Sequence, residues 1–216
     1  MRAITRRGLL AAGIAGLVAR PAGAAVPESG RLAFQAFRNG SAIGMHSLVF
    51  ARRGAELGVT IAVDYVVKFG PIPVYRYALR ATETWRGDDL LSVRAETNDD
   101  GETAFMRADR VDGRLAVDGS KSGRYTAPAG AIAATHWNQR EIDAPMINPQ
   151  NGDLMVFTVA PRGATTVTLA SGVATEALHF ALTGPSALDL WYDRAGVWVA
   201  LRAVARDGSL ITYVRA

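Results

Sequence analysis

The sequence contains no cysteine. This absence excludes disulfide bonds, cysteine-ligated zinc, iron–sulfur clusters and thiol nucleophiles. It also excludes a lipoprotein anchor, which requires an acylated N-terminal cysteine. Stability must therefore come from a hydrophobic core, and the 192 residues after position 24 are enough to build one sizeable core. We expect a single domain over residues 25–216.

Helical periodicity is almost absent from this part of the chain. Short stretches of alternating apolar and polar residues recur instead about every ten residues, which predicts an all-β antiparallel meander. Turn sequences such as Asn39-Gly40, Asp112-Gly113 and Asp207-Gly208 separate them. Gly, Asn and Asp tolerate the positive φ that tight hairpins require. The predicted strands cover 31–38, 42–52, 56–68, 73–86, 89–98, 102–111, 114–118, 153–160, 164–171, 174–183, 187–193, 197–206 and 209–215.

So many strands cannot stay in one flat sheet, because strand twist makes large sheets curl or split. We therefore predict a closed or half-open antiparallel barrel. The stretch 120–152 is irregular and contains three prolines, with a short helix expected over 130–142. It is either a lid or plug of the barrel, or a long connection between two halves of the sheet. The strand at 153–160 is apolar on both faces, which predicts cover on both sides.

The N-terminus has the pattern of a twin-arginine export signal. Arg6 and Arg7 precede an apolar run from Gly8 to Ala19, and Ala22-Gly23-Ala24 offers small residues to a signal peptidase. The run is shorter than the roughly 20 residues that span a bilayer. We expect cleavage after Ala24, recognition by the twin-arginine export machinery, and a periplasmic protein without a stable membrane anchor.

Charge gives no sign of a nucleic-acid partner. The net charge of +4 comes from the four arginines of residues 1–24, so the rest of the chain carries 20 basic and 20 acidic side chains. Basic residues lie singly along the predicted strands and form no stripe that would follow a phosphate backbone. We therefore predict no nucleic-acid binding.

Familiar catalytic motifs are also missing. The sequence after residue 24 has no G-x-S-x-G elbow, no Walker loop and no dinucleotide-binding glycine pattern. His46, His136 and His179 lie far apart and lack the spacing that presents two imidazoles to one metal ion. We predict no catalytic residue, no metal and no cofactor.

Aromatic side chains supply the candidates for ligand binding. Thr135-His136-Trp137-Asn138 presents an indole, an imidazole and an amide from the irregular segment, as a ligand mouth would. We expect Trp137 at that mouth, although a large aromatic can also be buried to anchor a long loop. The candidate ligand-binding residues are Tyr75, Tyr77, Trp85, His136, Trp137, Asn138 and Trp191.

Two acidic residues lie in otherwise apolar strand faces. Glu83 and Asp189 could each act as a general acid with a raised pKa, or could pair with an inward arginine such as Arg76 or Arg202. The pairing is favoured because the predicted strands supply many arginines.

A family resemblance is carried by aromatic and turn residues, namely Phe69-Gly70-Pro71-Ile72-Pro73-Val74-Tyr75-Arg76-Tyr77, Trp85, Thr135-His136-Trp137-Asn138 and Leu190-Trp191-Tyr192-Asp193. With them the chain resembles exported bacterial proteins grouped as domain-of-unknown-function family 6134, over nearly all of its length after residue 24. It is also similar in architecture to lipoprotein-carrier-like β-barrel domains, which hold acyl chains in a half-open barrel. The family supplies no catalytic or binding residue.

Together these features favour a non-enzymatic periplasmic carrier of an amphipathic envelope molecule, such as a lipid or glycolipid. Two alternatives stay open. One is a hydrolase of a cell-envelope polymer that uses Glu83 or Asp189 as its acid, and the other is a structural or assembly factor that uses a strand edge.

Overall fold

The computed structural model describes residues 25–216, so the predicted signal peptide lies outside the described residues. The first half of the described chain is a continuous run of strands. They are β1 (Arg31–Arg38), β2 (Ser41–Arg53), β3 (Glu56–Phe69), β4 (Ile72–Arg86), β5 (Asp89–Asp99), β6 (Glu102–Val111), β7 (Arg114–Gly119) and β8 (Gly123–Thr126).

The second half begins with an irregular stretch and returns to long strands. We call residues 127–157 the plug segment; it contains β9 (Ile132–Ala133), a 3-10 turn η1 (Gln139–Asp143), β10 (Met146–Ile147) and β11 (Leu154–Met155). The long strands that follow are β12 (Thr158–Thr168), β13 (Ala174–Thr183), β14 (Ala187–Asp193), β15 (Trp198–Val204) and β16 (Leu210–Arg215).

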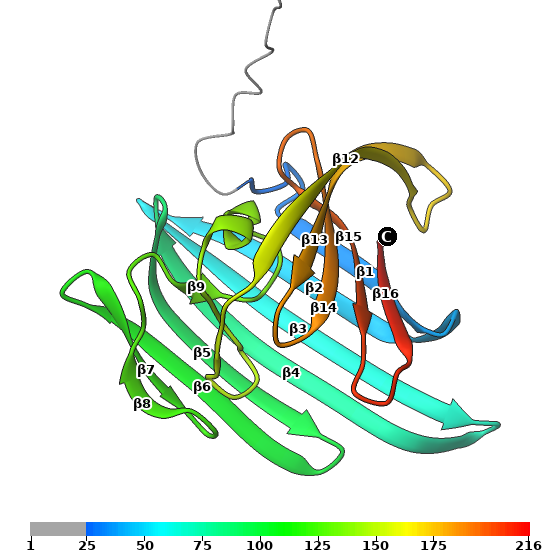
Figure 1. Ribbon diagram of the computed structural model, residues 1–216, viewed down its shortest axis with the longest axis horizontal. Helices are drawn as coiled ribbons and strands as arrows, with labels where there is room; N and C mark the ends of the chain where they lie inside the picture. The colour runs from blue at the N-terminus through cyan, green and yellow to red at the C-terminus, as the bar shows by residue number, and fades with distance from the viewer. Residues whose placement is uncertain (1–24) are drawn as a thin grey trace, which may run out of the picture.

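The long strands and β8 form one 13-stranded antiparallel sheet in the order β12-β13-β14-β15-β16-β1-β2-β3-β4-β5-β6-β7-β8. Pairing of β1 with β16 joins the two halves of the chain, and the sheet curls around the plug segment (Figure 1). The plug segment connects the edge strand β8 to the opposite edge strand β12. The plug segment therefore both connects the two edges of the sheet and packs inside its concave face.

The prediction of an all-β antiparallel meander is confirmed, and of the two predicted forms, a closed or a half-open barrel, the closed one is wrong. Within residues 25–216 no pairing joins the edge strands β8 and β12. The plug segment explains this, because its buried residues pack with the residues of the long strands in one core inside the curl. The predicted helix over 130–142 is reduced to η1, since His136 adopts a φ of 67°, which no α-helix accommodates.

The strand bounds predicted from alternation agree closely with the structure for β1 to β7. The wrong strand predictions lie near the plug segment. β12 is one strand that passes through a bulge at Pro161 and Gly163, where two separate strands were predicted. Cover on both sides of 153–160 is also wrong, because Leu154 is 40% and Val156 66% exposed.

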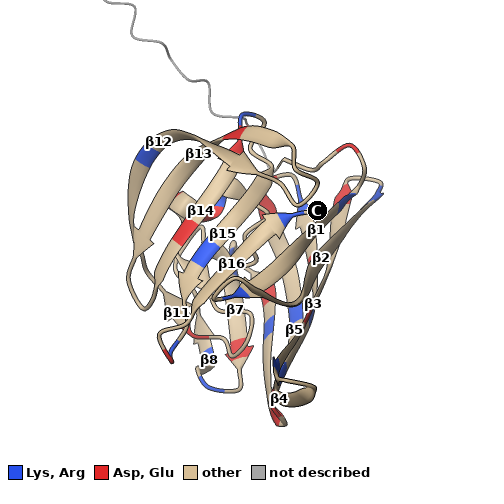
Figure 2. Ribbon diagram, turned by 90° about the vertical axis from the view of Figure 1, so that its right-hand side faces the viewer, with Lys and Arg blue, Asp and Glu red and all other residues tan. Residues whose placement is uncertain are grey.

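The inner face of the sheet is apolar and the outer face is charged. Leu48, Ile61 and Val93 belong to one buried core, together with the apolar residues of the plug segment. Outer arginines pair across strands with acids, as Arg80 does with Asp64 at 2.6 Å. Figure 2 shows both signs of charge scattered over the strands. Such exposed pairs contribute little to stability, so the inner face dominates folding. Among the described residues, no helix has the length and hydrophobicity needed to cross a membrane.

Gly44 allows a test of the close approach of β2 to β3 in the curled sheet. Its φ is +152°, and a Cβ placed there would lie 1.9 Å from the carbonyl oxygen of Asp64 on β3. We expect Gly44→Ala to lower the free energy of unfolding by about 2–4 kcal/mol. Gly58→Ala is the matched control on β3, because its Cβ would meet only ordinary contact at 3.6 Å from the oxygen of Ala51. It should gain about 0.5 kcal/mol. Urea unfolding of both variants measures this, and equal losses would contradict it.

Candidate functional site

A cavity of about 770 Å³ lies inside the curl. Its walls come from the inner faces of β2 to β4 and of β14 to β16, and from the plug segment. Most lining side chains are aliphatic or aromatic, and polar groups occur at its two ends. The lining includes Ile43, Ile61, Val63, Val67, Leu79, Met146, Met155, Phe157, Leu188, Leu201, Ala203 and Ile211.

The strand register orders the lining along one axis. Starting from the β3–β4 turn, the inward pairs are Val67 with Tyr75, then Tyr65 with Tyr77, then Val63 with Leu79. Ile61 follows as the innermost lining residue of β3. Val67 and Ile61 are six positions apart, so the cavity extends for about 20 Å along the strand at roughly 3.3 Å per residue.

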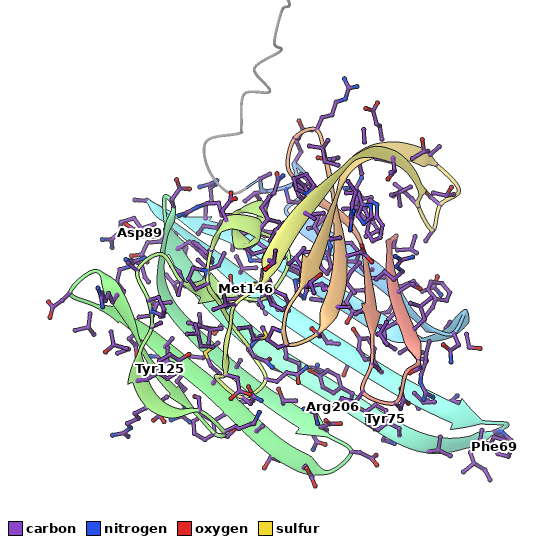
Figure 3. All side chains as sticks on the ribbon, viewed as in Figure 1. Phe69, Tyr75, Asp89, Tyr125, Met146 and Arg206 are labelled. Atoms are coloured by element: carbon purple, nitrogen blue, oxygen red, sulfur yellow. The ribbon has the colours of Figure 1, made fainter. Side chains whose placement is uncertain are left out.

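The mouth, near the β3–β4 turn, is polar. Arg38 donates through Nε to Ser209 at 2.9 Å and pairs with Asp207, and the hydroxyl of Tyr75 donates to Asp99 at 2.6 Å. Hydrogen bonds from the side chain and backbone of Ser209, together with Arg38, lower the pKa of Asp207 to about 2. Arg206 lies close to Tyr75 at this end (Figure 3). The mouth therefore presents two guanidinium groups and two carboxyl groups, those of Asp99 and Asp207, to a polar group of a ligand.

A collar of three tyrosines follows. The ring of Tyr65 stacks on that of Tyr77, with centroids 5.6 Å apart and an interplanar angle of 19°. The hydroxyl of Tyr65 donates to that of Tyr213. Burial is the main cause that raises the pKa of all three phenols, so they stay uncharged. The collar offers flat aromatic faces to an apolar guest.

His46 lies beyond the collar, at the inner end. It is 5% exposed, and neither Nδ1 nor Nε2 has a hydrogen-bond partner within residues 25–216. The rings of Phe34, Trp198 and Tyr213 surround it, with centroids 5.2 to 6.2 Å away. Burial, assisted by the nearby His136, lowers its pKa to about 3. His46 is therefore a neutral imidazole whose donor and acceptor are both unused by the chain.

A second imidazole faces the same end and is held in place by a buried carboxylate. His136 lines the cavity, and its Nδ1 lies 3.0 Å from Oε1 of Glu141, a residue with no exposed surface. The hydroxyl of Tyr192 on β14 also contacts this oxygen, at 2.8 Å. Since Nδ1 is occupied by Glu141, Nε2 on the far side of the ring is the nitrogen left for a ligand.

Glu83 lies directly behind this end and fastens the plug segment to β4. Its Oε1 accepts a hydrogen bond from the hydroxyl of Thr135 at 2.6 Å. Its Oε2 accepts from the indole N–H groups of Trp85 at 2.7 Å and Trp137 at 2.9 Å. Burial raises the pKa of Glu83, and the three hydrogen bonds oppose that rise. With its oxygens occupied and 2% exposed, Glu83 closes the cavity and does not face it.

The structure separates the predicted site residues into three groups. Tyr75, Tyr77 and His136 line the cavity. Trp85, Trp137 and Asn138 are buried behind it, so the expectation that Trp137 lies at the mouth is wrong. Glu83 explains this, because its buried carboxylate needs indole donors.

Trp191 lies on the outer face of the sheet. Its ring stacks on His179 at 4.4 Å, and His179 contacts Asp189 at 2.7 Å. Asp189 also accepts two hydrogen bonds from Arg202 at 2.9 and 3.0 Å, which confirms the arginine pairing predicted for it. Burial tends to raise the pKa of Asp189, but the bonds from His179 and Arg202 lower it overall. Glu83, by contrast, pairs with indoles and a hydroxyl.

Sequence reasoning missed His46, Tyr65 and Tyr213 as lining residues. The available signal for Tyr65 is that it alternates with Val63 and Val67 on one apolar strand face. His46 shares a strand face with Leu48 and Phe50, but nothing local shows that its ring would border a cavity. In residues 25–216, no group of three or more His, Cys, Asp or Glu side chains is arranged to hold a metal ion.

Comparison with known proteins gives a family and a fold. The model of a family described as a domain of unknown function, DUF6134, matches residues 34–216. A solved structure titled as a β-barrel-like protein of domain of unknown function DUF1849, from Brucella abortus, is similar with a TM-score of 0.60 and 13% identity. The match covers 86% of this chain and 94% of that chain, and at this identity it shows the fold alone. No curated protein matches.

We expect Glu83 to contribute to stability through its acceptor oxygens. Glu83→Leu would leave two indole N–H groups and a hydroxyl buried without their acceptor, and should lower the free energy of unfolding by about 3 kcal/mol or more. Glu83→Gln is the control, because its amide oxygen can accept from both indoles while its N–H donates to Thr135. It should stay within about 1 kcal/mol of the wild type in urea unfolding. Similar losses in both variants would mean that the charge itself is required.

His46 should make the protein acid-sensitive. Its folded pKa of about 3 lies below its ordinary value of 6.5, so the unfolded chain binds the extra proton. Stability is therefore highest above pH 6.5 and falls as the pH drops toward 3, by up to about 1.4 kcal/mol per unit. His46→Phe should remove this contribution. Unfolding of both proteins between pH 7 and pH 4 tests it, and parallel profiles would show that His46 is not the cause.

Proposed function

The chain belongs to the DUF6134 family, and from the cavity inside its curled sheet we propose that it is a non-enzymatic binding protein for an amphipathic small molecule. The observation that carries this proposal is the cavity itself. Its volume of about 770 Å³ falls in the range of roughly 300–1,000 Å³ typical of small-molecule sites. Its aliphatic and aromatic lining suits a hydrocarbon or a ring.

Charge at the mouth supports an amphipathic ligand over a purely apolar one. Arg38 and Arg206 line the cavity near the β3–β4 turn, whereas the strand walls between the two ends are mainly aliphatic and aromatic, with Asn148 and Gln150 of the plug segment beside them. A molecule with a polar group at the mouth and an apolar body in the collar would satisfy both regions. Lipids and glycolipids of the cell envelope have this build, and the predicted export signal would bring the protein to them.

The β3–β4 turn supports exchange of the ligand with an apolar environment. Phe69, Ile72 and Val74 are 80%, 61% and 55% exposed, and Val74 also lines the cavity. Figure 3 shows Phe69 at the tip of this long hairpin. A cluster of exposed apolar side chains usually marks a contact surface. We propose that this tip lies against the donor or acceptor of the ligand.

The hydrolase alternative has less support. A pair of hydrolytic carboxylates must flank one bond. Glu83 is buried behind the cavity with all three of its hydrogen bonds made inside the core, and Asp189 is bound to Arg202 and His179 on the outer face. The edges of β8 and β12 are the feature that an assembly factor would use, but neither edge adjoins the cavity mouth.

Filling the cavity should abolish binding. Ala203 lines the cavity on β15, so Ala203→Trp would place an indole in the ligand space. Thr82→Trp is the matched control, because Thr82 is exposed on the outer face of β4. Titration with the fluorescent probe N-phenyl-1-naphthylamine should show at least tenfold weaker binding for Ala203→Trp and no change for Thr82→Trp. Absence of probe binding to the wild type would refute the proposal.

A further inference from the structure

We propose that the inner end of the cavity recognises an uncharged hydroxyl head group, held between His46 and His136. The inference rests on the proposed binding function and names the chemical class of the ligand: a long-chain alcohol or a related lipid with a terminal hydroxyl. The mouth then receives the other end of the molecule.

The first observation is the unused hydrogen-bonding capacity of His46. A neutral imidazole has one N–H donor and one nitrogen acceptor, and neither nitrogen of His46 has a partner within residues 25–216. The side chain is 5% exposed and lines the cavity. Buried polar groups are nearly always hydrogen-bonded, so an exception that borders a cavity points to a ligand group.

The second observation is that His136 lines the same cavity and contacts the same indole as His46. Glu141 fixes its Nδ1, and both imidazoles flank the indole of Trp198, with centroid distances of 5.2 Å for His46 and 5.6 Å for His136. The backbone of His136 holds a φ of 67°, a conformation that costs energy in a residue with a side chain. Both imidazoles therefore lie beside one indole at this end of the cavity.

The third observation is the distribution of charge. The cationic side chains of the lining are Arg38 and Arg206, and both are at the mouth. Two buried carboxylates, Glu83 and Glu141, lie behind the inner end. A carboxylate head there would be buried without a cation and close to like charges, which is costly. An ammonium head would find the oxygens of Glu83 and Glu141 already engaged.

A hydroxyl group fits what remains. It donates one hydrogen bond and accepts others, so it can satisfy an N–H and an imidazole nitrogen together. Its chain would lie against the collar of Tyr65, Tyr77 and Tyr213 and extend toward the mouth. The axial length of about 20 Å, from the rise of roughly 3.3 Å per residue along β3, suits a chain of lipid length.

Competition with bound N-phenyl-1-naphthylamine tests the head group. Two competitors share a ten-carbon chain, namely 1-decanol and 1-methoxydecane. The ether is more apolar than the alcohol but cannot donate a hydrogen bond, so an unspecific apolar cavity would prefer the ether. We expect 1-decanol to compete at least tenfold better than 1-methoxydecane. Equal or better competition by the ether would overturn the proposal.

Two histidine variants test whether the preference for 1-decanol depends on His46. His46→Phe should retain the probe, because three aromatic rings already surround this position, but should lose the tenfold advantage of 1-decanol. His179→Phe is the matched control, since His179 lies on the outer face against Trp191 and should keep the advantage. An unchanged preference in His46→Phe would overturn the assignment.

A direct readout uses the wild-type protein. Nitrogen-15 NMR of the histidine rings should show the resonances of His46 move on addition of 1-decanol and stay in place on addition of 1-methoxydecane. Movement with both competitors would mean that the ring senses only occupancy of the cavity, and would overturn the proposal. Failure of the probe to bind at all would instead refute the binding function on which this inference rests.

Discussion

The carboxyl group of Glu83 joins the plug segment to the curled sheet through hydrogen bonds to both. The carboxyl group lies in a face of β4 that otherwise buries apolar residues, and it is tolerated because its oxygens receive hydrogen bonds from Trp85, Trp137 and Thr135. Two of these donors belong to the plug segment. The same bonds that stabilise the carboxylate therefore hold a long, irregular connection against the sheet, and give the cavity a closed inner end.

The open sheet and the cavity have a common cause. The 13 strands curl because of strand twist, and the pairing of β1 with β16 brings the two halves of the chain around one interior. A fully closed barrel could be filled by its own side chains. Here the plug segment fills one part of the interior, where Trp85 and Trp137 lie, and leaves the part beside Tyr65, Tyr77 and Tyr213 as a cavity.

Local patterns were enough to predict the strands but not the site. Alternation and hairpin turns gave β1 to β7, because a strand with one buried face carries its own period of two. Glu83 could be recognised as an anomaly in such a face. Its donors Thr135 and Trp137 could not be assigned, because they lie more than 50 residues away in a segment without periodicity. His46 was invisible for a related reason: what surrounds it comes from β1, β15 and β16.

The residue at position 46 shows how stability and binding oppose each other in this fold. Three aromatic rings surround it, so a phenyl ring there would pack well and would leave no polar atom unsatisfied. The imidazole of His46 does not contribute this stabilisation. Its destabilising effect grows at low pH, because the unfolded chain binds a proton that the folded protein does not. A core selected for stability alone would not contain it. The cost becomes intelligible when a ligand supplies one of the missing hydrogen bonds, since a ligand that binds only the folded state returns free energy to folding.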